Sequence, residues 1–175
     1  CAGTEPWPMT NIRQVFERGF AGEAYNILYP TYLGLGDRDL SPAGIDPECG
    51  RQLIWQYIDN LYAGQAGLSY HSASHAYSWD WGGLHLVQLQ RFGGDTRNGL
   101  AGSLEWLSAD LKAAAGRPTI LFQHYGWGAS ASEQACRRGD SDCIDDSGAP
   151  CRPGNRGCYR WWSDAEREAL DRTIA

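Results

Sequence analysis

Six cysteines are the residues of this 175-residue chain whose types and spacing most constrain its chemistry. Four of them fall in one segment rich in Gly, Asp and Arg, residues 136–158. A polar segment of that length is costly to order without cross-links, and disulfides persist in oxidising compartments. We therefore expect disulfides in a secreted or periplasmic protein. The full set is Cys1, Cys49, Cys136, Cys143, Cys151 and Cys158.

The pairing of these cysteines is open, because six cysteines permit many arrangements. Our prediction pairs Cys1 with Cys49 and joins the other four locally. A structural zinc site is the alternative, although the spacings are wider than the C-x2-4-C pattern typical of zinc ligands.

Two histidines, His71 and His75, lie four residues apart and would form a metal-binding pair if they shared one face of a helix. The surrounding Ser, Ala, Gly and Tyr instead predict a loop that leads into a strand. His85 lies within the apolar run LHLVQL, and we expect it to pack or to present a polar group on a sheet face.

Composition and charge exclude some functions. Apolar residues make up 42% of the chain and charged residues 21%, which is ordinary for one globular domain. No apolar run is long enough to span a membrane as a helix. The net charge is −6 without a basic stripe, which argues against a nucleic-acid groove. Small anionic substrates stay open, because a bound metal can supply local positive charge.

The elements that would position any site follow from local patterns. The order is helix, strand, helix, hairpin, helix, strand, long loop and helix, which predicts a layered α/β or α+β domain with a mixed sheet. Ser103 is expected to cap the third helix, and Ser163 with Glu166 forms a capping box for the last. The predicted helices are 11–18, Pro47–Tyr62, one from Ser103 and one from Ser163; the predicted strands are 29–35, 77–81, 84–89 and a buried Thr119–Phe122.

Three segments together resemble calcineurin-like metallophosphoesterases. YLGLGDRDL, residues 32–40, stands where that family usually has G-N-H-D or G-N-H-E after a strand. YSWDWGGLHLVQLQ, residues 77–90, is similar to the hairpin that follows. SLEWLSADLKAAAGRPTILFQHYGW, residues 103–127, is similar to the helix and strand that deliver a metal-binding histidine, and WWSDAEREAL to the helix before the last metal motif.

The resemblance implies metal-assisted hydrolysis of a phosphate mono- or diester, with two divalent cations that orient the phosphate and lower the pKa of an attacking water. Asp37 falls at a metal-bridging Asn position and His124 at a metal-ligand His. Arg38 stands where the family has a catalytic His, and Asp39 where a carboxylate orients that His. Arg38 can hold a phosphate by charge, but its high pKa prevents it from acting as a general acid.

The departures from the family pattern are large. The family's early D-x-H and G-D-x-x motifs and its late G-H-x-H motif are absent from these 175 residues. We therefore expect a partial calcineurin-like sandwich, a single incomplete domain over 1–175 with a cysteine-rich loop. Either the chain is a fragment of a longer enzyme, or it is a degenerate relative without efficient hydrolysis.

Two non-enzymatic alternatives remain. A disulfide-stabilised structural module would assemble with copies of itself, because open sheet edges and apolar faces favour self-association. A carbohydrate-binding module would use exposed tryptophans, although core packing explains most indoles more simply. The tryptophans concerned are Trp79, Trp81 and the pair Trp161 and Trp162, of which we expect the pair to be exposed.

Overall fold

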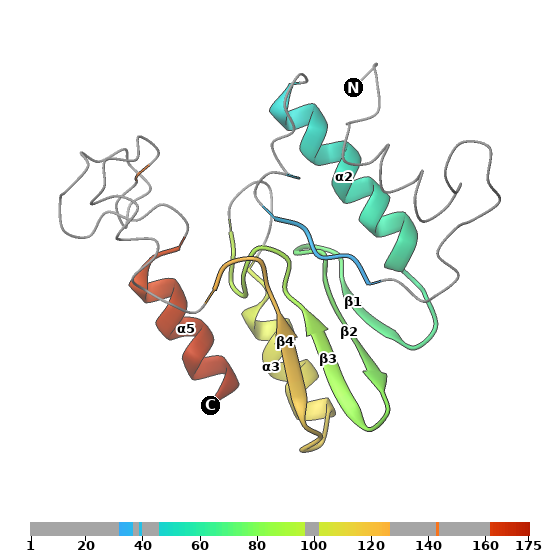
Figure 1. Cartoon of the computed structure of the whole chain (residues 1–175), viewed down its shortest axis with the longest axis vertical. Helices are drawn as coiled ribbons and strands as arrows, with labels where there is room; N and C mark the ends of the chain where they lie inside the picture. Colours follow the sequence, from blue (N-terminus) through green and yellow to red (C-terminus); the bar gives the residue numbers. More distant parts are fainter. Residues whose placement is uncertain (1–31, 37–38, 40–45, 97–101, 127–142, 144–161) are drawn as a thin grey trace.

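The computed structural model describes residues 32–36, 39, 46–96, 102–126, 143 and 162–175. These residues form a four-stranded mixed sheet with the strand order β1-β2-β3-β4, flanked by helices (Figure 1). The strands are β1 (Leu68–His71), β2 (Ala76–Trp81), β3 (Leu84–Gln88) and β4 (Thr119–Phe122), and the helices are α2 (Pro47–Tyr62), α3 (Leu104–Ala113) and α5 (Asp164–Ile174). The predicted mixed α/β architecture is confirmed.

Helices cover both faces of the sheet. Tyr77 points to one face and packs with Ile54 and Ile58 of α2. The preceding residue, Ala76, points to the other face and packs with Leu107 of α3 and Leu170 of α5. Because neighbouring side chains in a strand alternate between faces, the sheet lies between two apolar cores.

The hairpin of β2 and β3 forms as predicted. Trp81 pairs with Leu84 in the antiparallel register, so Gly82 and Gly83 are the two turn residues. Their φ angles are 58° and 84°, in the left-handed region that a two-residue hairpin turn requires. β4 then pairs parallel to β3, so these two strands end at the same edge of the sheet.

The predicted starts of α2 and α5 are confirmed, whereas the predicted side-chain cap of α3 is not formed. Pro47–Tyr62 is a helix, and Asp46 caps it by accepting the Cys49 N–H. Ser163 and Glu166 form the predicted capping box of α5. Ser103 does precede α3, but its hydroxyl makes no cap and instead accepts the Gly94 N–H at 3.1 Å.

Two strand predictions are wrong, one of them only in its burial, and one strand was missed. The described residues of the predicted strand 29–35, Tyr32 to Leu35, are not in a strand. β1 was not predicted. β4 was expected to be buried, but Ile120 and Phe122 are 43% and 42% exposed because β4 is the last strand of the sheet.

Some expectations concern residues outside the described ones. The helix at 11–18 and nearly all of the cysteine-rich segment 136–158 belong to this group. Among the described cysteines none is free, and Cys49 and Cys143 are both disulfide-bonded. The pairing of Cys1 with Cys49 stays a prediction. No helix among the described residues has the length and apolar character needed to cross a membrane.

Candidate functional site

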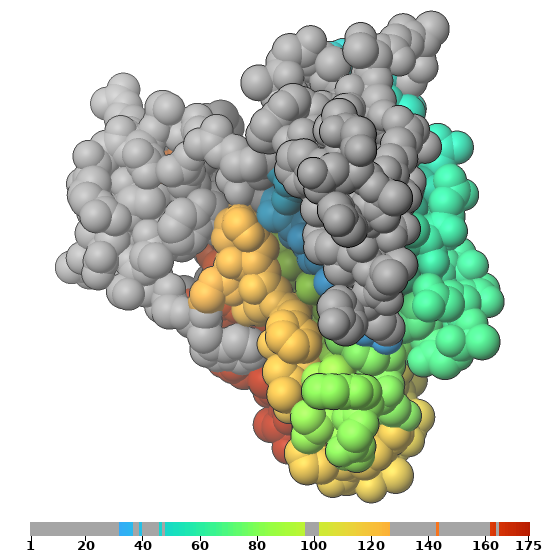
Figure 2. Space-filling model, turned by 45° about the vertical axis from the view of Figure 1, so that its right-hand side comes forward, coloured from blue at the N-terminus to red at the C-terminus, as the bar shows by residue number. Residues whose placement is uncertain are grey.

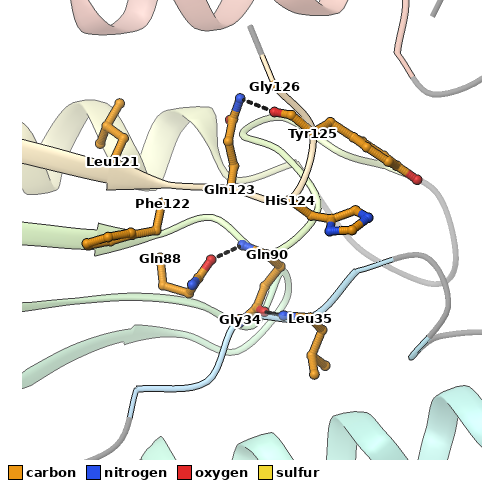
Figure 3. A pocket seen from close by; sticks show the side chains of 10 residues that line it. All are labelled: Gly34, Leu35, Gln88, Gln90, Leu121, Phe122, Gln123, His124, Tyr125 and Gly126. Atoms are coloured by element: carbon orange, nitrogen blue, oxygen red, sulfur yellow. Dashed lines mark hydrogen bonds between the residues drawn. The ribbon is translucent and has the colours of Figure 1, made fainter. Parts of the chain in front are cut away.

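A pocket of about 510 Å³ lies at the edge of the sheet where the parallel strands β3 and β4 end (Figure 3). Ligand sites of α/β sheets typically form beyond the carboxyl ends of strands. The pocket wall combines the ends of both strands with residues 34 and 35, which lie far away in sequence. Its lining consists of Gly34, Leu35, Gln88, Gln90, Leu121, Phe122, Gln123, His124, Tyr125 and Gly126.

Gln90 connects the parts of this pocket. Its side-chain Oε1 accepts the Leu35 N–H at 3.0 Å, and its Nε2 donates to the His75 carbonyl at 2.7 Å. Its backbone carbonyl accepts the His124 N–H at 2.9 Å. The residue is only 1% exposed and has φ of 60°. One buried glutamine therefore fixes both the segment before Asp37 and the position of His124.

Two tyrosines hold the same segment through Leu33. The Tyr62 hydroxyl accepts the Leu33 N–H at 2.7 Å, and the Tyr77 hydroxyl donates to the Leu33 carbonyl at 2.8 Å. Burial raises the pKa of Tyr77 far above its usual range, so this phenol stays a donor. Side chains thus satisfy the backbone groups that strand neighbours would otherwise have paired, which explains why this segment is ordered without being a strand.

Gly36 and His124 are in direct contact. A Cβ atom at position 36 would lie 2.6 Å from Cε1 of the His124 ring, so only glycine permits this approach. The Gly36 N–H donates to Oδ2 of Asp39 at 2.9 Å, which closes a tight turn. The chain that continues into Asp37 therefore leaves from beside the imidazole.

The four residues predicted for the site have different outcomes. His124 lies at the pocket and is exposed, and Asp39 holds the turn that starts at Gly36. Asp37 and Arg38 lie outside the described residues.

The segment after β4 is also held in place by contacts with Arg91. The Tyr125 N–H donates to the Arg91 carbonyl at 3.0 Å, and the Arg91 guanidinium lies 5.4 Å from the Tyr125 ring centroid. Arg91 is buried and pairs with buried Asp95 at 3.1 Å. A buried cation between an aromatic ring and a carboxylate gives the residues around His124 a rigid base.

No protein-family model, curated protein or solved structure matches this chain significantly. Interpretation of the pocket therefore depends on its geometry and on the residues it contains.

The donor chemistry at the pocket is compatible with a cation site. His124 supplies one imidazole, and Gly36, which contacts that ring, directly precedes Asp37 in the sequence. Imidazole and carboxylate suit the divalent metals used in hydrolysis. Within the described part of the chain, no three His, Cys, Asp or Glu side chains are grouped as metal ligands.

His71 and His75 do not form the helical metal pair. His71 ends β1 and contacts the Ser74 hydroxyl at 2.6 Å. His75 follows in the turn with φ of 54°, and its Nδ1 lies 2.8 Å from the Asp59 carboxylate. Burial lowers the pKa of His75, although nearby Asp59 opposes this shift. The interpretation as a loop leading into a strand is confirmed for residues 72–75, which form the turn before β2, and is wrong for His71, which belongs to β1.

His85 is a polar group on a sheet face, as predicted. Its Nδ1 lies 2.9 Å from Asp80 and its Nε2 lies 2.8 Å from Asp110, which also accepts a hydrogen bond from Ser78. Hydrogen bonds from His85 and Arg117 lower the pKa of Asp80. The cluster joins β2, β3 and α3 at the opposite end of β3 from the pocket, so its evident role is to anchor α3.

The tryptophan expectation is partly wrong. Trp162 is 2% exposed and packs against Phe92, so it cannot belong to an exposed pair. Trp79 stacks on Tyr32 with ring centroids 4.0 Å apart, whereas Trp81 at the hairpin tip is exposed. Trp161 lies outside the described residues.

Proposed function

We propose that this chain is a domain of a calcineurin-like, metal-dependent phosphoester hydrolase, present as a fragment or as a degenerate form. The observation that supports the proposal is the contact between Gly36 and His124. The resemblance assigns metal ligands to Asp37 and His124, which are 87 residues apart in the numbering (124 − 37). The contact places Gly36, the sequence neighbour of Asp37, against the His124 ring at the pocket where β3 and β4 end.

In this proposal each residue has one task. Asp37 and His124 hold a divalent cation, and Arg38 binds the phosphate of a small phosphoester by charge. Asp39 keeps the turn closed by accepting the Gly36 N–H. When bound, the cations polarise the phosphate and lower the pKa of a water. A secreted or periplasmic setting is part of the proposal, because disulfides persist in oxidising compartments.

Metal content and hydrolysis of p-nitrophenyl phosphate test this function. They are measured in this chain and in a longer form that supplies the missing motifs. We expect the longer form to bind metal and hydrolyse the ester, and His124→Ala to remove both properties. His71→Ala is the matched control, because His71 lies outside the pocket. Equal activity in His124→Ala and the parent would contradict the proposal.

The second candidate is a non-catalytic module that assembles with copies of itself. β4 is an edge strand of the sheet, and its residues Ile120 and Phe122 are exposed. Exposed apolar edge strands pair readily with other chains. If the module assembles through β4, light scattering detects oligomers and Ile120→Lys dissociates them. A concentration-independent monomer would rule out this function.

A further inference from the structure

The pocket beside His124 contains a hydrogen-bond donor that the proposed hydrolysis does not use. Gln88, the last residue of β3, is 8% exposed and lines the pocket. Its Oε1 accepts the Gln90 N–H at 2.9 Å, which identifies the other amide atom as Nε2. This nitrogen has no hydrogen-bond partner among the described residues. Figure 3 shows it beside Gly34 and Phe122.

Gly34 fixes the amide from the other side. A Cβ atom at position 34 would lie 2.3 Å from Gln88 Nε2, so the bare backbone is what leaves room for the amide group. Held by the Gln90 N–H on one side and by Gly34 on the other, Gln88 presents its donor in one orientation. A donor that is held in one orientation and faces a pocket is typical of a binding site.

An aromatic platform lies next to this donor. Phe122, the last residue of β4, lines the pocket and is 42% exposed. Its ring is within 12° of parallel to Trp79, with centroids 6.1 Å apart, so a second aromatic residue supports it. None of the described lining residues carries a carboxylate, lysine or arginine side chain. The platform therefore suits an uncharged planar group.

We propose that this pocket binds a nucleobase-like group: a planar ring that stacks on Phe122 and carries a carbonyl oxygen that accepts a hydrogen bond from Gln88 Nε2. Stacking supplies affinity for any flat ring, and the donor selects rings with an acceptor. The idea that this ring is the organic part of a phosphoester rests on the proposed function. The idea that the pocket binds such a ring is independent of it.

Uridine, which carries carbonyl acceptors and no phosphate, is the probe. Its binding to the full chain is followed by amide chemical shifts without added metal. We expect saturable shifts of pocket residues, and about tenfold weaker binding in Gln88→Glu. This variant keeps the oxygen that accepts the Gln90 N–H and replaces the donor with a second carboxylate oxygen, which also adds a negative charge. Gln65→Glu is the control, because Gln65 is exposed and lies outside the pocket.

A second variant tests the platform without touching the amide. Phe122→Leu is expected to weaken uridine binding about fivefold or more through lost stacking, whereas Ile120→Leu on the same strand leaves it unchanged. Unperturbed amide spectra away from the pocket show that each variant folds.

Three results would overturn the inference: no uridine binding, equal binding of glucose, or unchanged binding in Gln88→Glu. The two proposals fail separately. Uridine binding without metal-dependent hydrolysis by the longer form would contradict only the hydrolase, and hydrolysis by the longer form without uridine binding would contradict only the nucleobase pocket.

Discussion

Gln90 joins the two segments that form the candidate site, and nothing in the sequence marks it. A single glutamine after a strand is ordinary, and its four hydrogen bonds reach residues up to 55 positions away. Asp37 and His124 were assigned as candidate ligands through resemblance, because the motifs that contain them are local. The roles of Gln88 and Gln90 could not be predicted in this way, because they depend on which distant backbone groups lie beside these side chains.

Gln90→Met tests this role through stability. Methionine fills similar space but leaves the Leu35 N–H and the His75 carbonyl without the amide. Losing the partners of two buried groups costs about 2–5 kcal/mol of unfolding free energy. Urea denaturation measures the change, with Gln65→Met as the exposed control. A loss as small as the control's would show that the network does not stabilise the fold.

His75 should make stability depend on pH. Burial holds its folded-state pKa below the ordinary value of about 6.5, with Asp59 opposing and His71 adding to the shift. As pH falls below about 6.5, the unfolded chain binds a proton that the folded chain resists. The contribution is therefore full above that pH and is lost on acidification.

Urea denaturation at pH 7.5 and 5.5 measures this effect. We expect a smaller difference between the two pH values in His75→Asn than in the parent. Asparagine tolerates the left-handed φ at position 75 better than most residues do. An identical pH dependence in both proteins would assign the titration to other groups.

At the scale of elements, the sequence predicted those features that depend only on residues close together in the chain. The spacing of apolar residues predicted α2, and the double glycine predicted the hairpin of β2 and β3. β1 was missed because its four residues sit between turns. The burial of β4 was wrong because strand order, which no local pattern gives, puts β4 at the edge of the sheet.

The capping box of α5 offers an element-scale test. Ser163 accepts the Glu166 N–H, and Glu166 accepts the Ser163 N–H. Ser163→Ala should lower the unfolding free energy by about 1 kcal/mol, whereas Ser163→Thr should retain most of it, because threonine also caps helices. Thermal unfolding followed by circular dichroism compares the two. Equal losses would mean that packing at position 163, not the cap, is responsible.

At the scale of the whole molecule, the sheet separates two cores and brings its parallel strand ends to one open edge. Figure 2 shows β4 at the surface of the described region, with the hairpin of β2 and β3 beside it. The mixed α/β class could be predicted from the order of elements. The pocket could not be predicted, because it forms where residues 34 and 35 meet the ends of β3 and β4.

Manganese binding followed by NMR tests the proposed cation site most directly, because paramagnetic Mn²⁺ broadens the signals of nearby nuclei even when it binds weakly. We predict that substoichiometric Mn²⁺ selectively broadens the amide signals of Gly36 and His124, and that Asp37→Ala or His124→Ala abolishes the effect. Broadening that spares these two residues, or that persists unchanged in both variants, would contradict it.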